Sequence, residues 1–321
     1  MNFWKNIKNR PFFCLAPMAD VTDVAFRVMF AKYGKPDVLW TDFVAADGLC
    51  SVGKKKLLHI LKYSEKERPI IAQIFGAKPE NIKTASALIA KLGFDGIDIN
   101  MGCPDKSVLK QGAGASLIKN PKLAREIIRA CLAGIKSVKK NIPVSVKTRI
   151  GFNKVELEDW IGELIQEDIS AITIHARTKK EMSDVPADWS RVKKVVEMVR
   201  KSGKEILVIG NGDVKSVAEG KERARETDCD GIMVGRGAFG NPWFFNEQKK
   251  EIKVEEKLLG LLEHTKLFEK HLKNDKNFAV MKKHFKAYVS GFDGAKELRV
   301  KLMETSSYAE VKKIIFAYFP K

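Results

Sequence analysis

Cys103 has the sequence surroundings of a reactive side chain. It lies in Asn100-Met101-Gly102-Cys103-Pro104, directly after the apolar run at residues 96–99. Such a run predicts a buried strand, and a Gly and a Pro on either side of the cysteine predict a sharp turn. A thiol on a rigid loop at the carboxyl end of a strand lies where α/β folds carry out chemistry. The alternative is a half-buried cysteine that only packs, because free cysteines are among the most buried residues.

Polar residues also follow the other apolar runs of the chain. The groups at the run ends are Ala16-Pro17-Met18-Ala19, Gln73-Ile74-Phe75-Gly76, Lys147-Thr148-Arg149, His175-Ala176-Arg177-Thr178, Asn211-Gly212-Asp213 and Gly235-Arg236-Gly237. A buried strand that continues into a lysine or a histidine is costly unless the polar group has a partner. We therefore expect these residues to converge with Cys103 at one mouth of the fold.

The glycine-rich turns around Gly212 and Gly235 predict a phosphate site. Glycine lets backbone N–H groups approach an anion, and Arg236 adds a charged clamp. Residues 235–240 also match the dinucleotide fingerprint G-x-G-x-x-G. We reject that interpretation because Pro242 follows at once and no acidic strand end comes about 20 residues later.

These residues need elements that bring them together. Short β-rich runs lie at residues 13–18, 38–41, 70–75, 96–100, 144–147, 172–175, 206–209 and 232–234. Amphipathic segments between them include residues 80–92, 121–138, 156–167 and 190–201. Eight strand–helix units within residues 1–245 predict an α/β fold, a (β/α)8 TIM barrel, rather than a doubly wound sheet with a similar alternation.

From residue 246 to residue 321 only helical periodicity remains, which predicts an all-helical carboxyl-terminal domain of three or four helices packed on the barrel. One predicted helix there has a basic side and an apolar side, formed by Lys282, Lys283 and Lys286 and by Met281, Phe285 and Tyr288. The apolar side predicts a core face. The basic side predicts either a nucleic-acid contact or a merely solvated surface.

The bulk composition predicts a soluble, cytoplasmic protein. With 321 residues, 45% of them hydrophobic and 31% charged, the chain is ordinary for a globular protein. No apolar stretch approaches the ~20 residues that cross a membrane, and the amino terminus lacks a secretion signal. The five cysteines include no C-x-x-C pair, so we expect neither a zinc site nor a disulfide framework. Solvated or helix-capping positions are expected for the histidines without a motif, which are His59, His264, His271 and His284.

The net charge of +18 favours a polyanionic partner, nucleic acid before membrane. Lysines outnumber arginines by 45 to 13, and such a skew also arises from genome composition without any binding role. Charge alone therefore leaves both explanations open.

Taken together, the motifs resemble those of the tRNA-dihydrouridine synthases. The resemblance rests on residues 16–23, 100–104, 175–178, 211–213 and 235–236, in that order within residues 13–244. The helical tail is similar to that family's as well. Two positions depart from the family pattern: Asp20 stands where glycine is expected, and Asp42 stands where glutamate is commoner.

The resemblance implies a flavin mononucleotide (FMN) in the barrel mouth, NADPH as the usual reductant and a uridine of tRNA as the substrate. The implied FMN contacts are Pro17, Met18 and Ala19 along the ring, Gln73 at its edge, Lys147 and His175 at its polar side, and Asn211, Gly212, Asp213, Gly235 and Arg236 at the ribityl chain and phosphate. The predicted substrate contacts are Asn100, Arg149, Arg177, Lys282, Lys283 and Lys286. No metal site is expected.

Cys103 is the catalytic residue under this interpretation. Reduction of the 5,6 double bond of uracil needs a hydride at carbon 6, which reduced flavin supplies, and a proton at carbon 5. A cysteine with a pKa near ~8.5 keeps its proton at neutral pH and can donate it.

Two other functions stay open at this point. A dihydroorotate-dehydrogenase-like barrel would act on a free pyrimidine, but its sequence would lack the basic helical tail. A non-catalytic RNA-binding protein would have no use for Cys103, Lys147 and His175.

Overall fold

The computed structural model describes residues 2–319. Eight parallel strands form a closed barrel: β1 Phe12–Leu15, β2 Val38–Trp40, β4 Ile70–Phe75, β5 Gly96–Met101, β6 Val144–Arg149, β7 Ala171–His175, β8 Leu207–Asn211 and β9 Gly231–Val234. The pairing of β1 with β9 closes the barrel, and β2 pairs with β4. The remaining strand, β3 Val44–Ala45, is a two-residue extension beside the end of β4. The predicted TIM barrel is confirmed, and each of the eight predicted runs contributes a strand.

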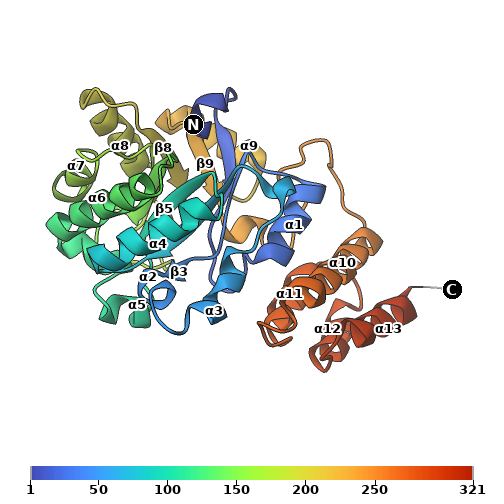
Figure 1. The fold of residues 1–321 in the computed structure, drawn as a ribbon. Helices are drawn as coiled ribbons and strands as arrows, with labels where there is room; N and C mark the ends of the chain where they lie inside the picture. Colours follow the sequence, from blue (N-terminus) through green and yellow to red (C-terminus); the bar gives the residue numbers. More distant parts are fainter. Residues whose placement is uncertain (1, 320–321) are drawn as a thin grey trace.

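Helices connect the strands and cover the outside of the barrel (Figure 1). They are α1 Val24–Tyr33, α2 Ala46–Leu49, α3 Lys54–Leu57, α4 Pro79–Lys91, α5 Lys106–Lys110, α6 Pro121–Ser137, α7 Gly162–Leu164, α8 Trp189–Lys201 and α9 Val217–Thr227. The segment predicted as one helix at residues 156–167 differs, because a wide turn at Leu157–Ile161 leads into the short α7. In that turn Trp160 is buried, and its Nε1 donates a hydrogen bond of 2.9 Å to Thr148 Oγ1.

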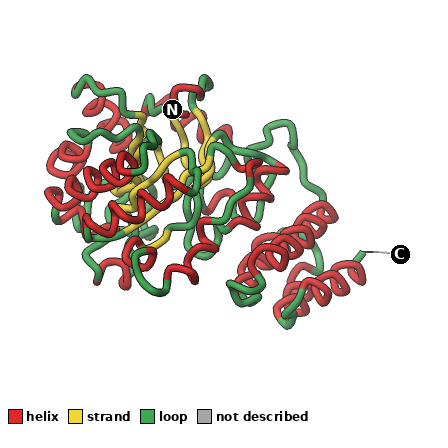
Figure 2. The backbone as a smooth tube through the Cα atoms, viewed as in Figure 1, coloured by secondary structure: helices red, strands yellow, loops and turns green. Residues whose placement is uncertain are grey.

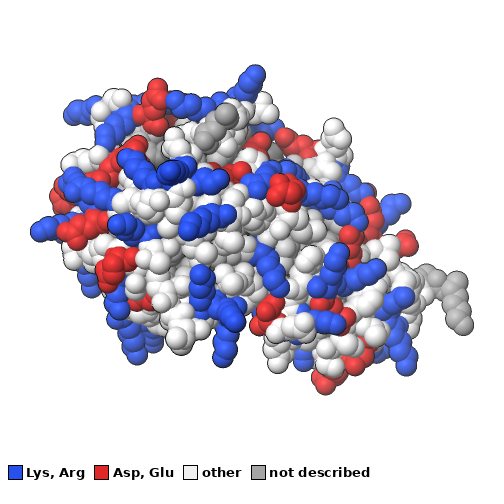
Figure 3. All heavy atoms as spheres, in the orientation of Figure 1, with Lys and Arg blue, Asp and Glu red and all other residues white. Residues whose placement is uncertain are grey.

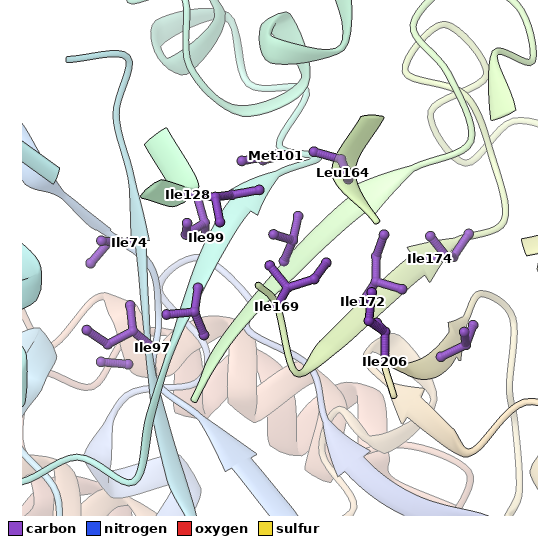
Figure 4. Packing of buried hydrophobic residues seen from close by; sticks show 14 of the residues in the cluster. Ile74, Ile97, Ile99, Met101, Ile128, Leu164, Ile169, Ile172, Ile174 and Ile206 are labelled. Atoms are coloured by element: carbon purple, nitrogen blue, oxygen red, sulfur yellow. The ribbon is translucent and has the colours of Figure 1, made fainter. Parts of the chain in front are cut away.

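Side chains along each strand alternate between two cores, as the pleat of a strand requires. Ile97, Ile99 and Met101 of β5 belong to the outer core between the sheet and the helices, part of which Figure 4 shows. The barrel interior holds a second apolar cluster made of Trp4, Phe12, Cys14, Ala16, Val38, Trp40, Ile71, Ala171, Ile209 and Met233. The polar residues at the carboxyl ends of the strands lie beyond this apolar filling.

Four helices follow the barrel: α10 Val254–Leu272, α11 Val280–Tyr288, α12 Ala295–Met303 and α13 Tyr308–Tyr318. They form a group beside the barrel (Figure 2), which confirms the predicted helical tail. Met281, Phe285 and Tyr288 are buried, as the apolar side of α11 predicted. The core of this group also includes Val24 and Ala25 of α1, so the tail packs on the barrel. No helix within residues 2–319 is long and apolar enough to cross a membrane.

Two histidines of the tail contradict the prediction of solvated or capping positions. His264 on α10 and His284 on α11 are fully buried, and their ring centroids lie 4.6 Å apart in an edge-to-face contact. Phe26 of α1 lies 5.8 Å from His264 and 5.5 Å from His284, so the pair sits at the junction of barrel and tail. Burial lowers the pKa of His264 to about 3 and holds that of His284 well below its usual value. By contrast, His59 contacts the Lys56 carbonyl oxygen at 2.8 Å beside the end of α3, as a capping residue does.

Candidate active site

The carboxyl ends of the strands surround a cavity of about 640 Å³. Its wall combines apolar residues with charged ones. The lining residues are Ala16, Pro17, Met18, Lys147, Arg149, His175, Arg177, Met182, Ser183, Asn211, Gly212, Asp213, Val214, Lys215, Met233, Gly235, Arg236 and Gly237. Five of the six strand-end groups that sequence analysis singled out therefore meet at one mouth of the barrel, whereas neither Gln73-Ile74-Phe75-Gly76 nor Cys103 is among the lining residues.

Most of the predicted site residues belong to this wall. Nine of the eleven predicted cofactor contacts line the cavity, while Ala19 and Gln73 are not among the lining residues. Of the predicted substrate contacts, Arg149 and Arg177 line it and Asn100 is buried beneath the Cys103 loop. Lys282, Lys283 and Lys286 lie apart on α11.

Cys103 is held on a loop beside the cavity. Its backbone N–H donates to Asn100 Oδ1 at 2.9 Å, and its carbonyl oxygen accepts from Ala115 N at 3.0 Å. Gly114 packs against it in the left-handed region, with φ at +59°, and a Cβ there would lie 2.8 Å from the Cys103 carbonyl oxygen. Burial raises the pKa of the Cys103 thiol. The thiol therefore keeps its proton at neutral pH, as a proton donor must.

Arg149 connects the Cys103 loop to the cavity wall. Its Nε donates to the Gly102 carbonyl oxygen at 2.8 Å, and its Nη1 donates to the carbonyl oxygens of Thr178 at 3.0 Å and Met182 at 3.2 Å. The side chain is buried, so these bonds are shielded from water. Arg149 thus braces the loop as well as lining the cavity.

Lys147 of β6 and His175 of β7 lie on neighbouring strands and form part of the polar wall. Lys147 Nζ donates to Asn211 Oδ1 at 3.2 Å, and burial together with the nearby Arg149 lowers the pKa of Lys147 to about 8. Burial and the surrounding lysine and arginines hold the pKa of His175 well below its usual value. Arg177 Nη1 lies 3.4 Å from His175 Nε2, so the neutral ring offers Nε2 as an acceptor.

The turns after β8 and β9 carry an excess of positive charge. Asp213 pairs with the buried Arg177 and, at 3.2 Å, with Arg236. The Arg236 side chain is 68% exposed, which leaves most of its donors available. Among the lining residues five cations, Lys147, Arg149, Arg177, Lys215 and Arg236, face the single carboxylate of Asp213. This part of the cavity is therefore suited to an anion such as a phosphate.

The two residues that depart from the family pattern meet beside the cavity. Asp20 adopts φ +54°, a left-handed conformation that Asp tolerates and glycine adopts freely. Its N–H donates to Asp42 Oδ2 at 2.8 Å, and its carboxylate pairs at 3.2 Å with Lys276 of the tail. Lys283 is half-buried near the same carboxylates, and burial lowers its pKa. Lys283 therefore faces the junction, whereas Lys286 is exposed.

Sequence analysis missed three residues that shape this site. Gly114 could have been noticed from the Gly112-Ala113-Gly114 cluster that follows the Cys103 loop. Asp98 and Ser145 lie inside the barrel, where Ser145 Oγ donates to Asp98 Oδ1 at 2.5 Å. Their only signal is a polar residue within an apolar strand. Within residues 2–319 no three His, Cys, Asp or Glu side chains gather as metal ligands do.

Comparison with known proteins identifies one family. The family model described as dihydrouridine synthase (Dus) matches residues 14–318. The chain is 41% identical over 317 residues to a probable tRNA-dihydrouridine synthase of Staphylococcus aureus, covering 98% of this chain and 94% of the relative. It is 42% identical over 318 residues to one of Staphylococcus epidermidis, covering 98% and 95%. It is also 40% identical over 317 residues to probable tRNA-dihydrouridine synthase 2 of Bacillus subtilis, covering 98% and 95%.

Solved structures support the fold. Histamine dehydrogenase from Rhizobium sp. 4-9 aligns with a TM-score of 0.52 at 13% identity, covering 81% of this chain and 49% of that one. An amine oxidase from Pseudomonas geniculata N1 aligns with a TM-score of 0.54 at 13% identity, covering 74% and 46%. At such low identity these similarities concern the fold alone.

Proposed function

Because the chain belongs to the dihydrouridine synthase family, we propose that it is a tRNA-dihydrouridine synthase, an enzyme that reduces the 5,6 double bond of a uridine in tRNA. The observation that carries the proposal is a protonated thiol, that of Cys103, fixed beside a cationic cavity at the mouth of the barrel. A tRNA substrate implies that the enzyme works in the cytoplasm.

The cavity fits an FMN cofactor. Its volume of about 640 Å³ lies in the range of ligand sites. Ala16, Pro17 and Met18 offer an apolar wall for a flat ring, and the cations around Asp213 suit a phosphate. A Cβ at Gly235 would lie 3.5 Å from the Ala16 Cβ, so glycine keeps space open against that wall. When bound, the flavin supplies the hydride for carbon 6 of uracil.

The residues of the chain have separate tasks around that cofactor. Pro17, Met18 and Ala19 would contact the ring, and Lys147 and His175 its polar side, whereas Gln73, expected at the ring edge, is fully buried and would support this wall from below. The ribityl chain and phosphate would be held by Asn211, Gly212, Asp213, Gly235 and Arg236. Lys147 keeps a positive charge at this wall below its pKa of about 8, which favours negative charge on a ligand there. NADPH is the proposed hydride source for the flavin.

Cys103 moves the proton. Its Sγ–H is the donor to carbon 5 of the uracil, and the loop bonds from Asn100 and Ala115 keep Sγ in place. Arg149, Arg177 and Asn100 would orient the uridine at the mouth. Arg149 also fixes the Gly102 carbonyl, so the substrate contact and the proton donor share one support.

The two parts of the chain divide the work. Residues 1–245 would form the FMN-binding catalytic domain, and residues 246–321 the tRNA-binding domain. On the face seen in Figure 3, Lys and Arg side chains spread over both the barrel and the tail. Positive charges that are spread over both parts suit a large polyanion, with phosphates along its length, better than a small molecule.

The experiment uses the purified full-length chain, NADPH and an unmodified tRNA transcript. Dihydrouridine is measured by mass spectrometry of the digested RNA, in parallel with free uridine and orotate as substrates. We expect a flavin absorption spectrum and reduction of the tRNA only. Equal reduction of a free pyrimidine, or a protein that takes up no flavin, would overturn the proposal.

A further inference from the structure

A carboxylate without a role in the proposed reaction lies inside the barrel. Asp98 is in the middle of β5 and is fully buried. Its Oδ1 accepts from Ser145 Oγ at 2.5 Å, and its Oδ2 accepts from Gln73 Nε2 at 2.6 Å. A buried carboxylate is costly, and two hydrogen bonds offset only part of that cost. Its position therefore calls for a function.

A continuous chain of hydrogen bonds runs from Asp98 to the Cys103 loop. Gln73 donates to Asp98 through Nε2 and accepts through Oε1 from Asn100 Nδ2 at 2.9 Å. Asn100 Oδ1 in turn accepts from the backbone N–H groups of Gly102 at 3.1 Å and Cys103 at 2.9 Å. Gln73 and Asn100 are both buried, so water does not compete for these bonds.

The groups at the two ends of this hydrogen-bond chain allow only one orientation of the amides between them. An ionised carboxylate can only accept, and the backbone N–H groups of Gly102 and Cys103 can only donate. The two amides between them must therefore both point their oxygens toward the loop and their NH2 groups toward Asp98. Burial raises the pKa of Asp98 to about 6, so the carboxylate is ionised at neutral pH. The titratable groups that interact electrostatically with this carboxylate are Lys147, Cys14 and Cys131.

We propose that Asp98 is a positioning residue, which sets the orientation of Gln73 and Asn100 and through them holds the Cys103 loop. This inference deepens the proposed function, since it assigns the support of the proton donor. Asp98 is not among the residues that line the cavity, and its hydrogen-bonded connection to the Cys103 loop runs through the two amides, although its charge also attracts the lining residue Lys147. This positioning role depends on the donor-to-acceptor direction of the hydrogen bonds, and not only on side chains that fill the same space.

The direction of the hydrogen bonds can be reversed by moving the carboxylate from position 98 to position 100. Asp98→Asn keeps an oxygen for Gln73 and gives an NH2 to the Ser145 hydroxyl, so it should be tolerated. Asn100→Asp places a second acceptor against Gln73 Oε1, and Gln73 cannot turn without meeting Asp98. The double variant Asp98→Asn/Asn100→Asp lets Gln73 turn over and satisfies every group again. The parent, the two single variants and the double variant form a double-mutant cycle. A directional chain of hydrogen bonds predicts that Asp98→Asn compensates for the effect of Asn100→Asp.

The readout is amide hydrogen exchange at Gly102 and Cys103 in the full-length protein, which does not depend on turnover. We expect Asn100→Asp to speed exchange about tenfold, the effect of losing one buried hydrogen bond, and the double variant to return within about threefold of the parent. Asp230→Asn is the matched control, because Asp230 Oδ2 accepts from Val208 N at 2.8 Å elsewhere in the barrel. It should leave exchange at the two loop amides unchanged.

A double variant that exchanges as fast as Asn100→Asp, or faster, would overturn the proposal. So would an Asn100→Asp protein whose loop exchanges at the parent rate. If the parent instead fails to reduce tRNA while the cycle behaves as expected, the proposed function fails and the support of the loop by Asp98 stands.

Discussion

At the scale of single residues, the site separates the proposed proton donor, Cys103, from the groups that hold its loop. The Cys103 N–H and carbonyl oxygen are both bonded, to Asn100 and to Ala115, while the Asp105 backbone N–H lies near Sγ. Arg149 and Arg177 direct donors to backbone carbonyl oxygens, at Gly102 and Val185 respectively. Arg236 is the exposed cation at the phosphate turn. Substitutions of these residues should therefore have distinct effects.

Cys103→Ala should keep its flavin and lose most turnover, because only the proton donor is removed. General acid catalysis is typically worth about 10² to 10⁴ in rate. The measurement is the initial rate of dihydrouridine formation, with the flavin content read from the absorption spectrum. Near-normal rates in this variant would exclude Cys103 from the mechanism.

Arg236→Ala should weaken flavin retention while the fold survives. An exposed side chain contributes little to stability, but a charged contact with a phosphate is worth about tenfold to a hundredfold in affinity. Equilibrium dialysis against FMN measures the change. Lys215→Ala, a change of another cation in the same wall, serves as the comparison, and equal flavin affinity in all three proteins would show that the phosphate lies elsewhere.

At the scale of elements, the strand register brings the site together. Asn100 pairs with Lys147, and Arg149 with His175, so neighbouring strands end at the same level. The α1 helix is tied to the rest of the barrel by a fully buried ion pair, in which Arg27 Nε lies 2.6 Å from Glu67 Oε2. The loop before α1 lines the cavity, so this pair also steadies the site.

Glu67→Gln should lower the free energy of unfolding by about 3 kcal/mol, since breaking a buried pair leaves the Arg27 charge uncompensated. Urea unfolding followed by circular dichroism gives the value. Glu65→Gln on the same turn is the control, because Glu65 is exposed where it pairs with Arg68 and should change stability far less than Glu67→Gln does. Equal effects of the two changes would contradict the importance of the buried pair.

The elements could be predicted largely because buried apolar runs mark barrel strands. All eight runs were found, but the two-residue β3 is too short for any periodicity, and the wide turn at Leu157–Ile161 has the same apolar spacing as a helix. In the site, residues at strand ends stood out as polar groups next to turns. Asp98 and Ser145 did not, because an inward polar residue within a strand has no distinguishing neighbour in the sequence. The contact of Asp20 with Lys276 joins distant parts of the chain and leaves no local signal.

At the scale of the whole molecule, the junction of barrel and tail is both apolar and charged. His264, His284 and Phe26 fill its interior, and ion pairs such as Lys32–Glu263 and Lys62–Asp275 cross it at the edge. The junction lies next to the cavity, since Asp20 follows the lining residues Pro17 and Met18. Docking of the tail and the shape of the site are therefore linked.

Acid should weaken this junction. Burial depresses the pKa of both histidines in the folded protein, so they favour folding fully above their unfolded pKa near 6.5 and lose that stability as the pH falls below it, in the case of His264 down to about 3. At pH 5.5 the loss is about 1.4 kcal/mol for His264, and the effect of His284 has the same sign. Lys276 and Lys283 also face His284, and their charges act in the same direction.

The pH effect is measured as the difference in urea midpoint between pH 7.5 and pH 5.5. His264→Phe/His284→Leu should show a smaller difference than the parent, because the titrating groups are gone while the other carboxylates and lysines remain. An identical pH dependence in both proteins would mean that the pair does not titrate on unfolding.

The basic face of α11 should contribute to tRNA binding through the exposed Lys286 and the half-buried Lys282. Lys282→Glu/Lys286→Glu is expected to weaken tRNA binding and to reduce the slope of log K against log salt by about 0.7 to 0.9 for each phosphate that the protein no longer neutralises. FMN affinity should not change. Lys283 is left intact, because it faces Asp20 and Asp42 at the junction. Binding that is unchanged at every salt concentration would show that this face is only solvated.

The ion pair between Asp20 and Lys276 has a consequence for how this protein can be recombined with its relatives. Asp20 occupies a loop position where a glycine is expected, and its carboxylate pairs with a lysine that is itself only 9% exposed. A chimera that joins this barrel to a tail without that lysine would leave Asp20 solvated, at little cost, because its side chain is 65% exposed. The reverse chimera would bury an unpaired ammonium against a foreign loop. A tail that carries Lys276 therefore needs a barrel with a carboxylate at position 20, whereas this barrel accepts a tail without the lysine.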